Sequence, residues 1–276
     1  MVSAASRVSY ALPPAPGIDE VCVVIPTFNE SANIGRLIER LRELGPLRVI
    51  VVDDGSPDGT GAVVDALARR DERLEVIHRQ SKSGRGSACL EGLRRALSRP
   101  QTRCVVEMDA DFSHDPSELS SMVAALADTD VVVRSRYLPG SSVLGWSLSR
   151  RIFSKASNRL ARLLLNIPLS DLTNGYRAYS RPAAECVAAR DLCLSGYIAL
   201  SESADRLYAQ GFRFAELPTV FVNRVRGQSN LSLYEIYQAL SGILRLGAAR
   251  AARTIWPWAK TKATPRIGSR GTRPLP

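Results

Sequence analysis

LRVIVVDDGSPDGT, residues 47–60, is the segment that most clearly indicates the architecture of this protein. Its apolar, β-branched first half predicts a buried strand, and the Asp and Gly residues that follow predict a tight turn. Thr60 then begins a pattern that is typical of a helix. Strand, turn and helix in this order begin a βαβ unit, which belongs to a parallel sheet with helices on both faces.

The same alternation extends along most of the chain. Further strands are predicted over 21–26, 74–78, 103–109, 130–137, 175–180 and 215–225, and helices over 31–44, 60–70, 87–97, 148–166, 196–210 and 231–252. The expected fold class is α/β, with a Rossmann-like, mostly parallel sheet flanked by helices. Right-handed crossovers bring the carboxyl ends of the strands to one edge, where ligands of such sheets bind. Polar segments do follow the strands there, namely PTFNE at 26–30, DDGS at 53–56, HR at 78–79 and DAD at 109–111.

Length and composition are those of an ordinary folded protein, with 276 residues of which 45% are hydrophobic. The five cysteines are scattered without CxxC or Cys/His spacing, which predicts neither a disulfide framework nor a zinc site. Neither a signal-peptide pattern nor a run of roughly 20 apolar residues is found in the sequence, so we expect a cytoplasmic protein. The expected organisation is a flexible leader over 1–20, one catalytic domain over 21–246, and a basic, Pro-rich, disordered tail over 247–276.

Basic residues exceed acidic ones by 37 to 27, which gives a formal charge of +10. Two segments, 131–170 and 236–276, contain no acid at all. Such asymmetry favours a polyanionic partner, either nucleic acid or an anionic membrane surface. A basic face that serves only solubility is the alternative, and the apolar residues interleaved with the charges make it less favoured.

DADFSHD, residues 109–115, gathers three carboxylates and a histidine directly after an apolar strand. Like charges this close repel unless a cation lies between them. Asp109 and Asp111 are two residues apart and so project to one side of an extended backbone. Because Mg²⁺ often takes one or two carboxylates together with substrate phosphates, we expect a metal site here. The cation is expected to bind weakly alone and more tightly with a nucleoside diphosphate.

The other polar residues of the two acidic loops have simpler expected roles. Asp115 is expected to cap the helix that follows it, and His114 to pack or hydrogen-bond locally. Ser56, Asp58 and Thr60 are candidate caps for the helix that begins near residue 60. A cap needs only one short acceptor, which leaves the pair Asp53 and Asp54 to accept from the N–H and O–H groups of a nucleotide.

Several motifs together resemble one enzyme family, the family 2 glycosyltransferases of GT-A fold, and specifically the polyprenol (dolichol) phosphate mannose synthases of actinobacterial type. The motifs are IPTFNE, VVDDGSPDGT, MDADFSHDP, RSRYLPG, LSRRIFSKASN, DLTNGYRAY and NRVRGQSNLS, and they span roughly residues 21–246. The resemblance implies an inverting enzyme that transfers mannose from GDP-mannose to polyprenyl monophosphate. It also implies Mg²⁺ or Mn²⁺ as cofactor, and amphipathic helices in the C-terminal part that lie at a membrane interface.

The resemblance implies roles for individual residues as well. Those of the nucleotide-sugar donor site are Pro26, Asn29, Glu30, Asp53, Asp54, Lys82, Gly84, Asp109, Ala110 and Asp111. Those of the acceptor phosphate site are Arg136, Arg150, Ser154 and Arg224. The implied metal ligands are Asp109 and Asp111, with Ser113 at the third position of the metal loop. The residues implied to act in catalysis are Asp111, Arg136 and Arg224.

The acceptor implied by the resemblance agrees with the charge pattern. A phosphate monoester, whose second pKa is about 6, is already an anionic nucleophile and needs positioning rather than a general base. The basic segment 131–170 has the character expected of its site. Because a polyprenyl phosphate lies in a membrane, we expect peripheral contact on the cytoplasmic face, with a separate membrane anchor protein as an open possibility, and no nucleic acid. The apolar residues expected to contribute are Leu144, Trp146, Ile152, Phe153, Trp256 and Trp258.

Two positions differ from the usual family pattern and keep the donor sugar open. Asn230 stands where a lysine is expected and Leu200 where a glutamine is expected, while Glu202 keeps the carboxylate position. The alternative is therefore a related family 2 transferase that uses another nucleotide hexose, of UDP-glucose type, or another acceptor. A nucleotidyltransferase is disfavoured because no glycine-rich triphosphate loop follows the first strand. A nucleic-acid-binding protein is disfavoured because no helix-turn-helix, RRM or zinc-finger signature is present.

Overall fold

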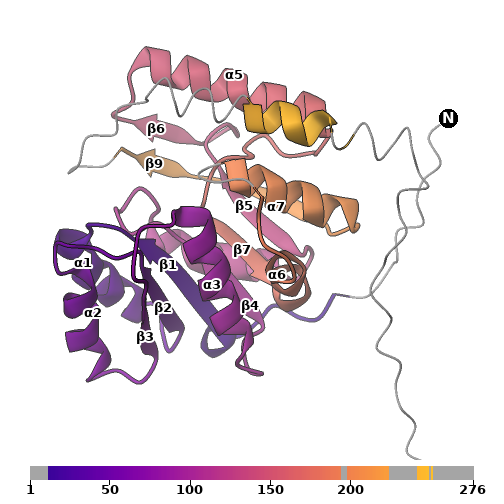
Figure 1. The fold of residues 1–276 in the computed structure, drawn as a ribbon. Coiled ribbons are helices and arrows are strands. Elements are labelled where there is room, and N and C mark those ends of the chain that lie inside the picture. Colours follow the sequence, from indigo (N-terminus) through magenta and orange to yellow (C-terminus); the bar gives the residue numbers. More distant parts are fainter. Residues whose placement is uncertain (1–11, 194–197, 224–240, 249, 251–276) are drawn as a thin grey trace, which may run out of the picture.

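A seven-stranded sheet forms the centre of the protein in the computed structural model, which describes residues 12–193, 198–223, 241–248 and 250 (Figure 1). The strand order is β3-β2-β1-β4-β7-β5-β8. The strands are β1 (Val21–Thr27), β2 (Arg48–Asp53), β3 (Leu74–His78), β4 (Cys104–Glu107), β5 (Val131–Ser135), β7 (Arg177–Ser180) and β8 (Phe214–Pro218). β7 runs antiparallel to both of its neighbours and the other pairs are parallel, so the sheet is mostly parallel, as predicted.

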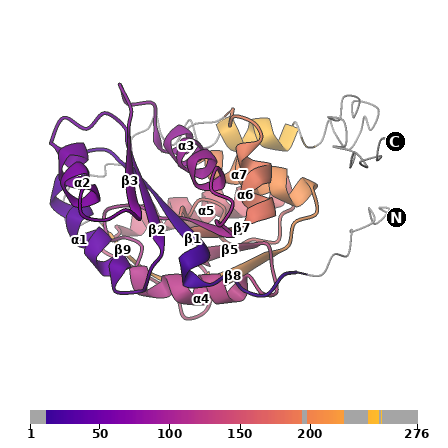
Figure 2. The same cartoon turned by 90° about the horizontal axis from the view of Figure 1, so that it is seen from below.

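Helices cover both faces of this sheet (Figure 2). They are α1 (Ser31–Arg42), α2 (Thr60–Ala68), α3 (Arg85–Leu97), α4 (Leu119–Ala125), α5 (Leu148–Leu165), α6 (Arg181–Ala188) and α7 (Ile198–Ala209), with the short 3-10 helices η1 (Ile18–Glu20) and η2 (Pro116–Glu118). Buried side chains of α1, α2 and α4 form a core on one face, and those of α3, α6 and α7 form a core on the other.

Neighbouring residues of one strand enter different cores. Val23 and Ile25 of β1 belong to the core on the α1 face, whereas Cys22 and Val24 belong to the core on the α3 face. Side chains alternate across a strand, so a wholly apolar run buries both of its faces. These fully buried strands give the loops at their carboxyl ends a rigid base.

The order of the strands reverses next to β1. β1, β2 and β3 follow one another toward one edge, and α3 then crosses back so that β4 pairs with the other side of β1. Open α/β sheets bind their ligands at such a switch point, beyond the carboxyl ends of the strands. Residues 28–30 follow β1 and residues 108–111 follow β4, so two of the predicted donor segments meet there.

The predicted strand 215–225 is in fact two strands. β8 belongs to the main sheet, whereas β9 (Val220–Val222) pairs in parallel with β6 (Ser142–Leu144) in a separate small sheet below α5 (Figure 1). Pro218 ends β8 because proline lacks the N–H that would continue the ladder. β6 and α6 were not predicted: β6 is only three residues long, and α6 begins directly after β7 with no turn between them.

Both ends of the described chain contact the domain. Arg103 Nη2 donates to the Pro14 carbonyl at 2.9 Å and Nη1 to Glu20 Oε2 at 3.0 Å, so part of the predicted leader lies against the folded body. Residues 241–248 are helical, and Ile243 is buried in the α3-side core. The predicted domain limits stay predictions, because residues 1–11 and most of the tail lie outside the described residues. Among the helices that are described, none is both long and apolar enough to cross a bilayer.

Candidate active site

The loops after β1 and β2 are joined by hydrogen bonds between their own residues. Asp53, at the end of β2, accepts from the Thr27 hydroxyl at 3.2 Å and from both the N–H and the hydroxyl of Ser56. Ser56 Oγ in turn accepts from the Asn29 N–H at 3.0 Å. Asn29 has a φ of 60°, a left-handed conformation that asparagine adopts more readily than most residues. The predicted donor residues Asn29 and Asp53 therefore belong to one connected pair of loops.

Asp58 holds the amino ends of α1 and α2 together. Its Oδ1 accepts from the Thr60 N–H at 3.0 Å and the Thr60 hydroxyl at 2.6 Å, and its Oδ2 accepts from the Ser31 N–H at 3.0 Å. Burial would raise the pKa of Asp58, but the hydrogen bonds from Thr60 and Ser31 outweigh it and lower the pKa to about 2. Gly59 occupies the cap position of α2, so Asp58 lies one residue before the predicted place, but it still accepts from the first N–H of both helices.

Asp54 binds the turn that leads into α3. Its carboxylate accepts from the N–H groups of Ser83, at 3.0 and 3.1 Å, and Gly84, at 2.7 Å, and forms an ion pair with Arg79 at 2.7 Å. Gly84 has a φ of 94°, which favours glycine. These partners satisfy Asp54 within the protein, which corrects the expectation that a nucleotide is needed to explain the second carboxylate. Its role in donor binding stays a prediction.

The remaining residues of the predicted nucleoside site border these loops. Pro26 lies in β1. Glu30 Oε2, just before α1, accepts from Asn33 Nδ2 at 2.8 Å. Lys82 Nζ lies 3.9 Å from the centre of the Phe28 ring, which is a cation–π contact. The segment before α3 therefore reaches the loop after β1.

The carboxylates of Asp109 and Asp111 lie on the loop after β4, where 18% of the Asp109 side chain is exposed and Asp111 is buried. Asp111 accepts from the Ser113 N–H at 3.0 Å, and Ser113 itself is buried. Nowhere in the described residues do three His, Cys, Asp or Glu side chains gather into a metal cage. A pair of carboxylates suits a Mg²⁺ or Mn²⁺ ion that completes its coordination with substrate phosphates and water, and a contribution of Ser113 to the ion stays a prediction.

Arg85, in the first turn of α3, supplies positive charge to the acidic loop. Its Nε donates to Asp109 Oδ1 at 2.8 Å, its Nη2 donates to the Gly175 carbonyl at 3.2 Å, and its Nη1 lies 3.6 Å from Glu107 Oε2. Burial opposes this charge, but the carboxylates of Asp109 and Glu107 raise the pKa of Arg85 above its ordinary value. Arg85 was not among the predicted residues, although Gly84 beside it was. The available signal was a lone cation between two glycines at a helix start.

His114 is buried, and both of its ring nitrogens are used. Nδ1 accepts from the Asp109 N–H at 3.0 Å, and Nε2 pairs with Asn174 Oδ1 at 3.0 Å. Since Nδ1 accepts, the proton of the neutral ring lies on Nε2. Burial is the largest influence on the pKa of His114 and lowers it. The ring also stacks on Tyr176, with centroids 4.9 Å apart. The expected local role is confirmed: His114 accepts from the Asp109 N–H and so stabilises the loop at residues 109–115.

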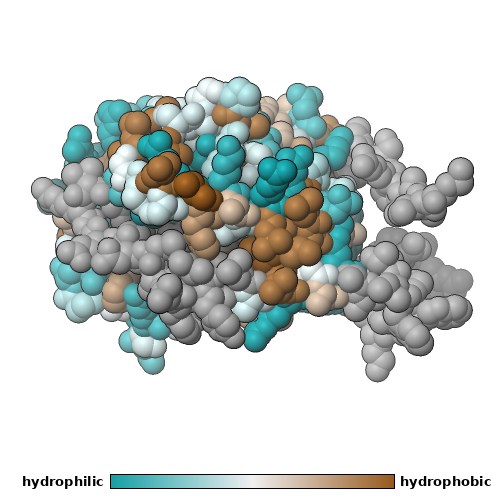
Figure 3. All heavy atoms as spheres, turned by 90° about the horizontal axis from the view of Figure 1, so that it is seen from above, coloured by the Kyte–Doolittle hydropathy of each residue, from teal (hydrophilic) through white to brown (hydrophobic). Residues whose placement is uncertain are grey.

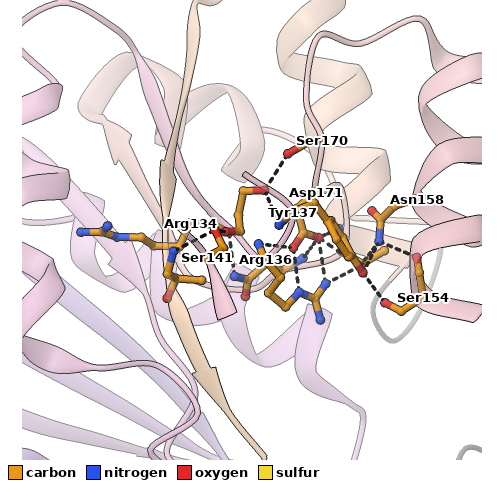
Figure 4. Close-up of polar contacts among 12 residues, drawn as sticks. Arg134, Arg136, Tyr137, Ser141, Ser154, Asn158, Ser170 and Asp171 are labelled. Carbon is orange, nitrogen blue, oxygen red and sulfur yellow. Dashed lines mark hydrogen bonds and ion pairs between the residues drawn. The ribbon is translucent and has the colours of Figure 1, made fainter. Parts of the chain in front are cut away.

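Arg136 forms a buried, two-pronged ion pair with Asp171 (Figure 4). Its Nε lies 2.7 Å from Asp171 Oδ2 and its Nη2 lies 2.8 Å from Oδ1, while Nη2 also donates to Thr173 Oγ1 at 2.8 Å. Burial would raise the pKa of Asp171, but the charge and hydrogen bonds of Arg136 lower it. The pair fixes the guanidinium in place and offsets part of the charge that it can offer to a phosphate.

Arg150 and Ser154 lie beside Arg136, as expected of residues that share one binding site. The guanidinium carbons of Arg150 and Arg136 lie 4.4 and 5.2 Å from the centre of the same ring, that of Trp146. Ser154 Oγ is 2.6 Å from the hydroxyl of Tyr137 (Figure 4). The structure thus gathers the three predicted residues into one cluster, and their contact with an acceptor phosphate stays a prediction. Position 224, the fourth, lies outside the described residues.

Two expectations for this region are corrected. Trp146, expected at a membrane, is only 9% exposed, with two arginines over its ring. Arg134, one of the charges in the acid-free segment, is buried on β5 and lies 3.4 Å from Glu118. Glu118 and Asp171 come from outside that segment, so a stretch without acids in the sequence is not a region without acids in space.

Asn174 and Phe221 connect the metal loop to the arginine cluster. The Asn174 side chain bonds His114, and its backbone N–H donates to Asp171 Oδ1 at 3.0 Å. Phe221, on β9, lies with its ring centre 6.1 Å from that of His114 and 5.4 Å from the guanidinium carbon of Arg136. The two groups of predicted residues therefore form one continuous site.

The sequence also matches a known protein family. Residues 22–188, more than half of the chain, match the family model described as glycosyl transferase family 2. The chain belongs to this family. This glycosyltransferase is 40% identical over 228 residues to the polyprenol monophosphomannose synthase of Mycolicibacterium smegmatis, covering 82% of the chain and 86% of the relative. It is 36% identical over 230 residues to the undecaprenyl-phosphate mannosyltransferase of Micrococcus luteus, covering 83% and 94%.

Solved structures confirm the GT-A-like α/β fold of this glycosyltransferase. Glucosyl-3-phosphoglycerate synthase from Mycobacterium tuberculosis, in complex with Mn²⁺, UDP and phosphoglyceric acid, superposes with a TM-score of 0.60 at 21% identity, over 82% of this chain and 78% of that one. Mannosyl-3-phosphoglycerate synthase from Rubrobacter xylanophilus gives 0.59 at 19% identity, over 91% and 82%. At these identities the likeness concerns the fold alone.

The positions that keep the donor sugar open lie in and beyond α7. Leu200 is buried, and its carbonyl accepts from Arg177 Nη1 at 2.7 Å. Both carboxylate oxygens of Glu202 accept from the Cys193 N–H, at 3.0 and 2.9 Å, so Glu202 binds the segment that precedes the helix. Asn230 lies outside the described residues.

Proposed function

We propose that this glycosyltransferase moves mannose from GDP-mannose to a polyprenyl monophosphate, with inversion at the anomeric carbon and with the help of Mg²⁺ or Mn²⁺. The observation that carries the proposal is the polar chain from the metal loop through His114 and Asn174 to the pair Asp171 and Arg136. It joins carboxylates suited to a metal-bound diphosphate to arginines suited to a phosphate. The names of the two curated relatives support mannose and a polyprenyl acceptor.

On the donor side, the loops after β1 and β2 would hold the nucleoside through residues such as Asn29 and Asp53. Asp109 and Asp111 would bind the divalent cation, which stabilises the negative charge that develops on the departing diphosphate. Lys82, in the turn before α3, adds positive charge beside the loop after β1. Asn29 and Asp53 are already hydrogen-bonded to their neighbours within these loops.

On the acceptor side, Arg136 and Arg150 would orient the lipid phosphate, whose oxygen attacks the anomeric carbon. A phosphate monoester with a second pKa of about 6 needs no proton removed at neutral pH. His114 agrees with this, because both of its nitrogens are bonded within the protein and burial lowers its pKa. Arg224, predicted to close over the reacting phosphates, completes the proposed site.

The outer face of α5 supports contact with a membrane surface. Leu148, Ile152 and Leu163 are 73%, 61% and 71% exposed, and basic residues lie between them. Figure 3, which looks down on this side of the molecule, shows apolar side chains interspersed with hydrophilic ones. Apolar groups that enter the headgroup region and cations that pair with anionic lipids together favour peripheral binding. We place this contact on the cytoplasmic face.

The test is transfer of label from GDP-[¹⁴C]mannose to a polyprenyl phosphate in the presence of Mg²⁺. We expect label in the organic phase, its loss with EDTA, and its return when excess Mg²⁺ or Mn²⁺ is added. No organic-phase product with any nucleotide sugar would overturn the proposal.

A donor screen with the polyprenyl phosphate held fixed separates the alternative. Efficient transfer from UDP-glucose but not from GDP-mannose would assign the enzyme to another hexose, which the departures at Leu200 and Asn230 leave open. Repeating the screen with Leu200→Gln shows whether this buried position affects the choice of donor.

A further inference from the structure

Arg85 is ion-paired with the loop at residues 109–115, which carries the predicted metal ligands. Its Nε lies 2.8 Å from Asp109 Oδ1 and its Nη1 lies 3.6 Å from Glu107 Oε2, with only 16% of the arginine side chain exposed. Its Nη2 bond to the Gly175 carbonyl leaves little room, because a Cβ at position 175 would lie 2.7 Å from Arg85 Cζ. The guanidinium is therefore held in place from three directions.

The turn that carries Arg85 also binds the predicted nucleoside loop. Ser83 and Gly84, the two residues before Arg85, donate their N–H groups to Asp54. One short segment thus contacts a predicted nucleoside carboxylate through its backbone and a predicted metal carboxylate through its next side chain. A nucleotide bound at Asp54 would lie against the segment that positions Arg85.

The positive charge of Arg85 affects how tightly a divalent cation can bind at Asp109. Repulsion between neighbouring carboxylates would by itself favour a divalent cation at Asp109, but Arg85 already neutralises that carboxylate, and its positive charge opposes a second cation nearby. A nucleoside diphosphate changes the balance, because its negative charges compensate for both cations. The sequence-based expectation of weak metal binding alone therefore has a different physical origin, which is Arg85.

We infer that Arg85 is a positioning residue that keeps Asp109 ion-paired in the free enzyme and so makes divalent metal binding depend on the nucleoside diphosphate. This inference rests on the proposed function, because it takes Asp109 as a metal ligand. Coupling of this kind is reciprocal, so the metal must increase the affinity for the nucleotide by the same factor. Its typical size is about 5-fold to 150-fold.

The experiment is calorimetric titration of the full chain with Mn²⁺, alone and with saturating GDP. In the wild-type protein we expect GDP to lower the Kd for Mn²⁺ by about tenfold or more. In Arg85→Met we expect tighter Mn²⁺ binding alone, by a similar factor, and a smaller effect of GDP. Arg85→Gln serves as a second neutral variant, and Arg94→Met, an exposed position on the same helix, is the matched control with unchanged values.

The outcomes separate this inference from the proposed function. If Asp109→Asn abolishes Mn²⁺ binding but the neutral variants at Arg85 bind Mn²⁺ alone no more tightly than wild type, the metal site stands and the role of Arg85 is wrong. Equal Mn²⁺ affinity with and without GDP in the wild-type protein also overturns the inference, whichever variants fold. If Asp109→Asn leaves Mn²⁺ binding unchanged, the metal site itself is wrong and both proposals fall.

Discussion

The donor and acceptor halves of the site neutralise their charged groups by different means. In the donor half, carboxylates accept mainly from backbone N–H groups and hydroxyls, both within one turn, as Asp58 does from Thr60, and between loops, as Asp54 does from Gly84, 30 residues away. In the acceptor half, arginines pair with partners far along the chain: Arg136 with Asp171, 35 residues away, and Arg150 with Asn223, 73 residues away. The donor half is therefore held mainly by main-chain and hydroxyl donors of loops at one sheet edge, with partners up to 30 residues apart, whereas the acceptor half is held by arginine side chains whose partners lie 35 and 73 residues away.

This difference has a functional consequence. Loops that are built on strand ends and hydrogen-bonded to one another present a donor site of well-defined shape. The arginine cluster depends on β9, α5 and the loop before β7 meeting at one place, so changes in any of them alter the acceptor site. Substitutions in the two halves should accordingly produce different mixtures of lost activity and lost stability.

The largest expected effect is on the chemistry of the donor half. Asp111→Asn should reduce kcat/KM by about a hundredfold to a thousandfold, because it removes charge that stabilises the leaving diphosphate through the metal. Its stability should stay near that of wild type, since the side-chain oxygen of asparagine can still accept from the Ser113 N–H. Transfer assays and thermal unfolding measure the two quantities. The control is Asp128→Asn, at an exposed aspartate that also follows β4 in the sequence. Equal activity in the two variants would contradict the assignment.

At the buried ion pair of Arg136 and Asp171, in the acceptor half, we expect a substitution to lower stability strongly. Asp171→Asn leaves Arg136 without its bidentate partner, and breaking a buried pair costs about 3–5 kcal/mol of the free energy of unfolding. Replacing both residues, as Arg136→Met with Asp171→Asn, should recover most of that stability while transfer remains lost, because the asparagine oxygen can still accept from the Asn174 N–H. Urea denaturation gives the stability values. A double variant that regains activity would show that Arg136 does not contact the acceptor.

A smaller effect is expected at Arg150, which is not part of that pair. Arg150→Gln should raise KM for the polyprenyl phosphate about tenfold or more with little change in KM for the donor, since a hydrogen bond to a charged group is worth about 1.5–3 kcal/mol. A short-chain, water-soluble acceptor keeps membrane binding out of the measurement. Arg159→Gln, an exposed residue of the same helix, should leave both values near wild type. A rise confined to the KM of the donor would show that Arg150 contributes to donor binding and not to acceptor binding.

The smallest expected effect is on the local turns of the donor half. Asp58→Ala removes a carboxylate that accepts from the first N–H of two helices, as a cap would, and should cost about 1–2 kcal/mol of stability. Because the pKa of Asp58 is lowered to about 2 in the folded protein, its contribution is complete above pH about 4 and is lost as the pH falls toward 2. Denaturation curves of wild type and variant should therefore converge in that acid range. Curves that stay parallel down to pH 2 would contradict this role.

The donor half was predicted in more detail than the acceptor half, and particular residues show why. Asp53 and Asp109 lie at the ends of strands that are marked by runs of valine and isoleucine, so their meeting at one sheet edge follows from the βαβ rule alone. Asp171, Asn174 and Arg85 were missed as site residues although they lie inside or beside recognised motifs. Their partners are 24 to 60 residues away, and no local spacing indicates which side chain will meet which.

The amino-acid sequence determined the α/β architecture, the edge of the sheet that carries the site and the family of the enzyme, because strand runs, turn residues and motifs are local patterns. Only the tertiary structure decided how the charges are shared. It buried Trp146 under two arginines, paired Arg136 with a carboxylate and set Arg85 against the metal loop. Ion pairing depends on which side chains are brought within a few ångströms and removed from water, and that is a property of the assembled domain.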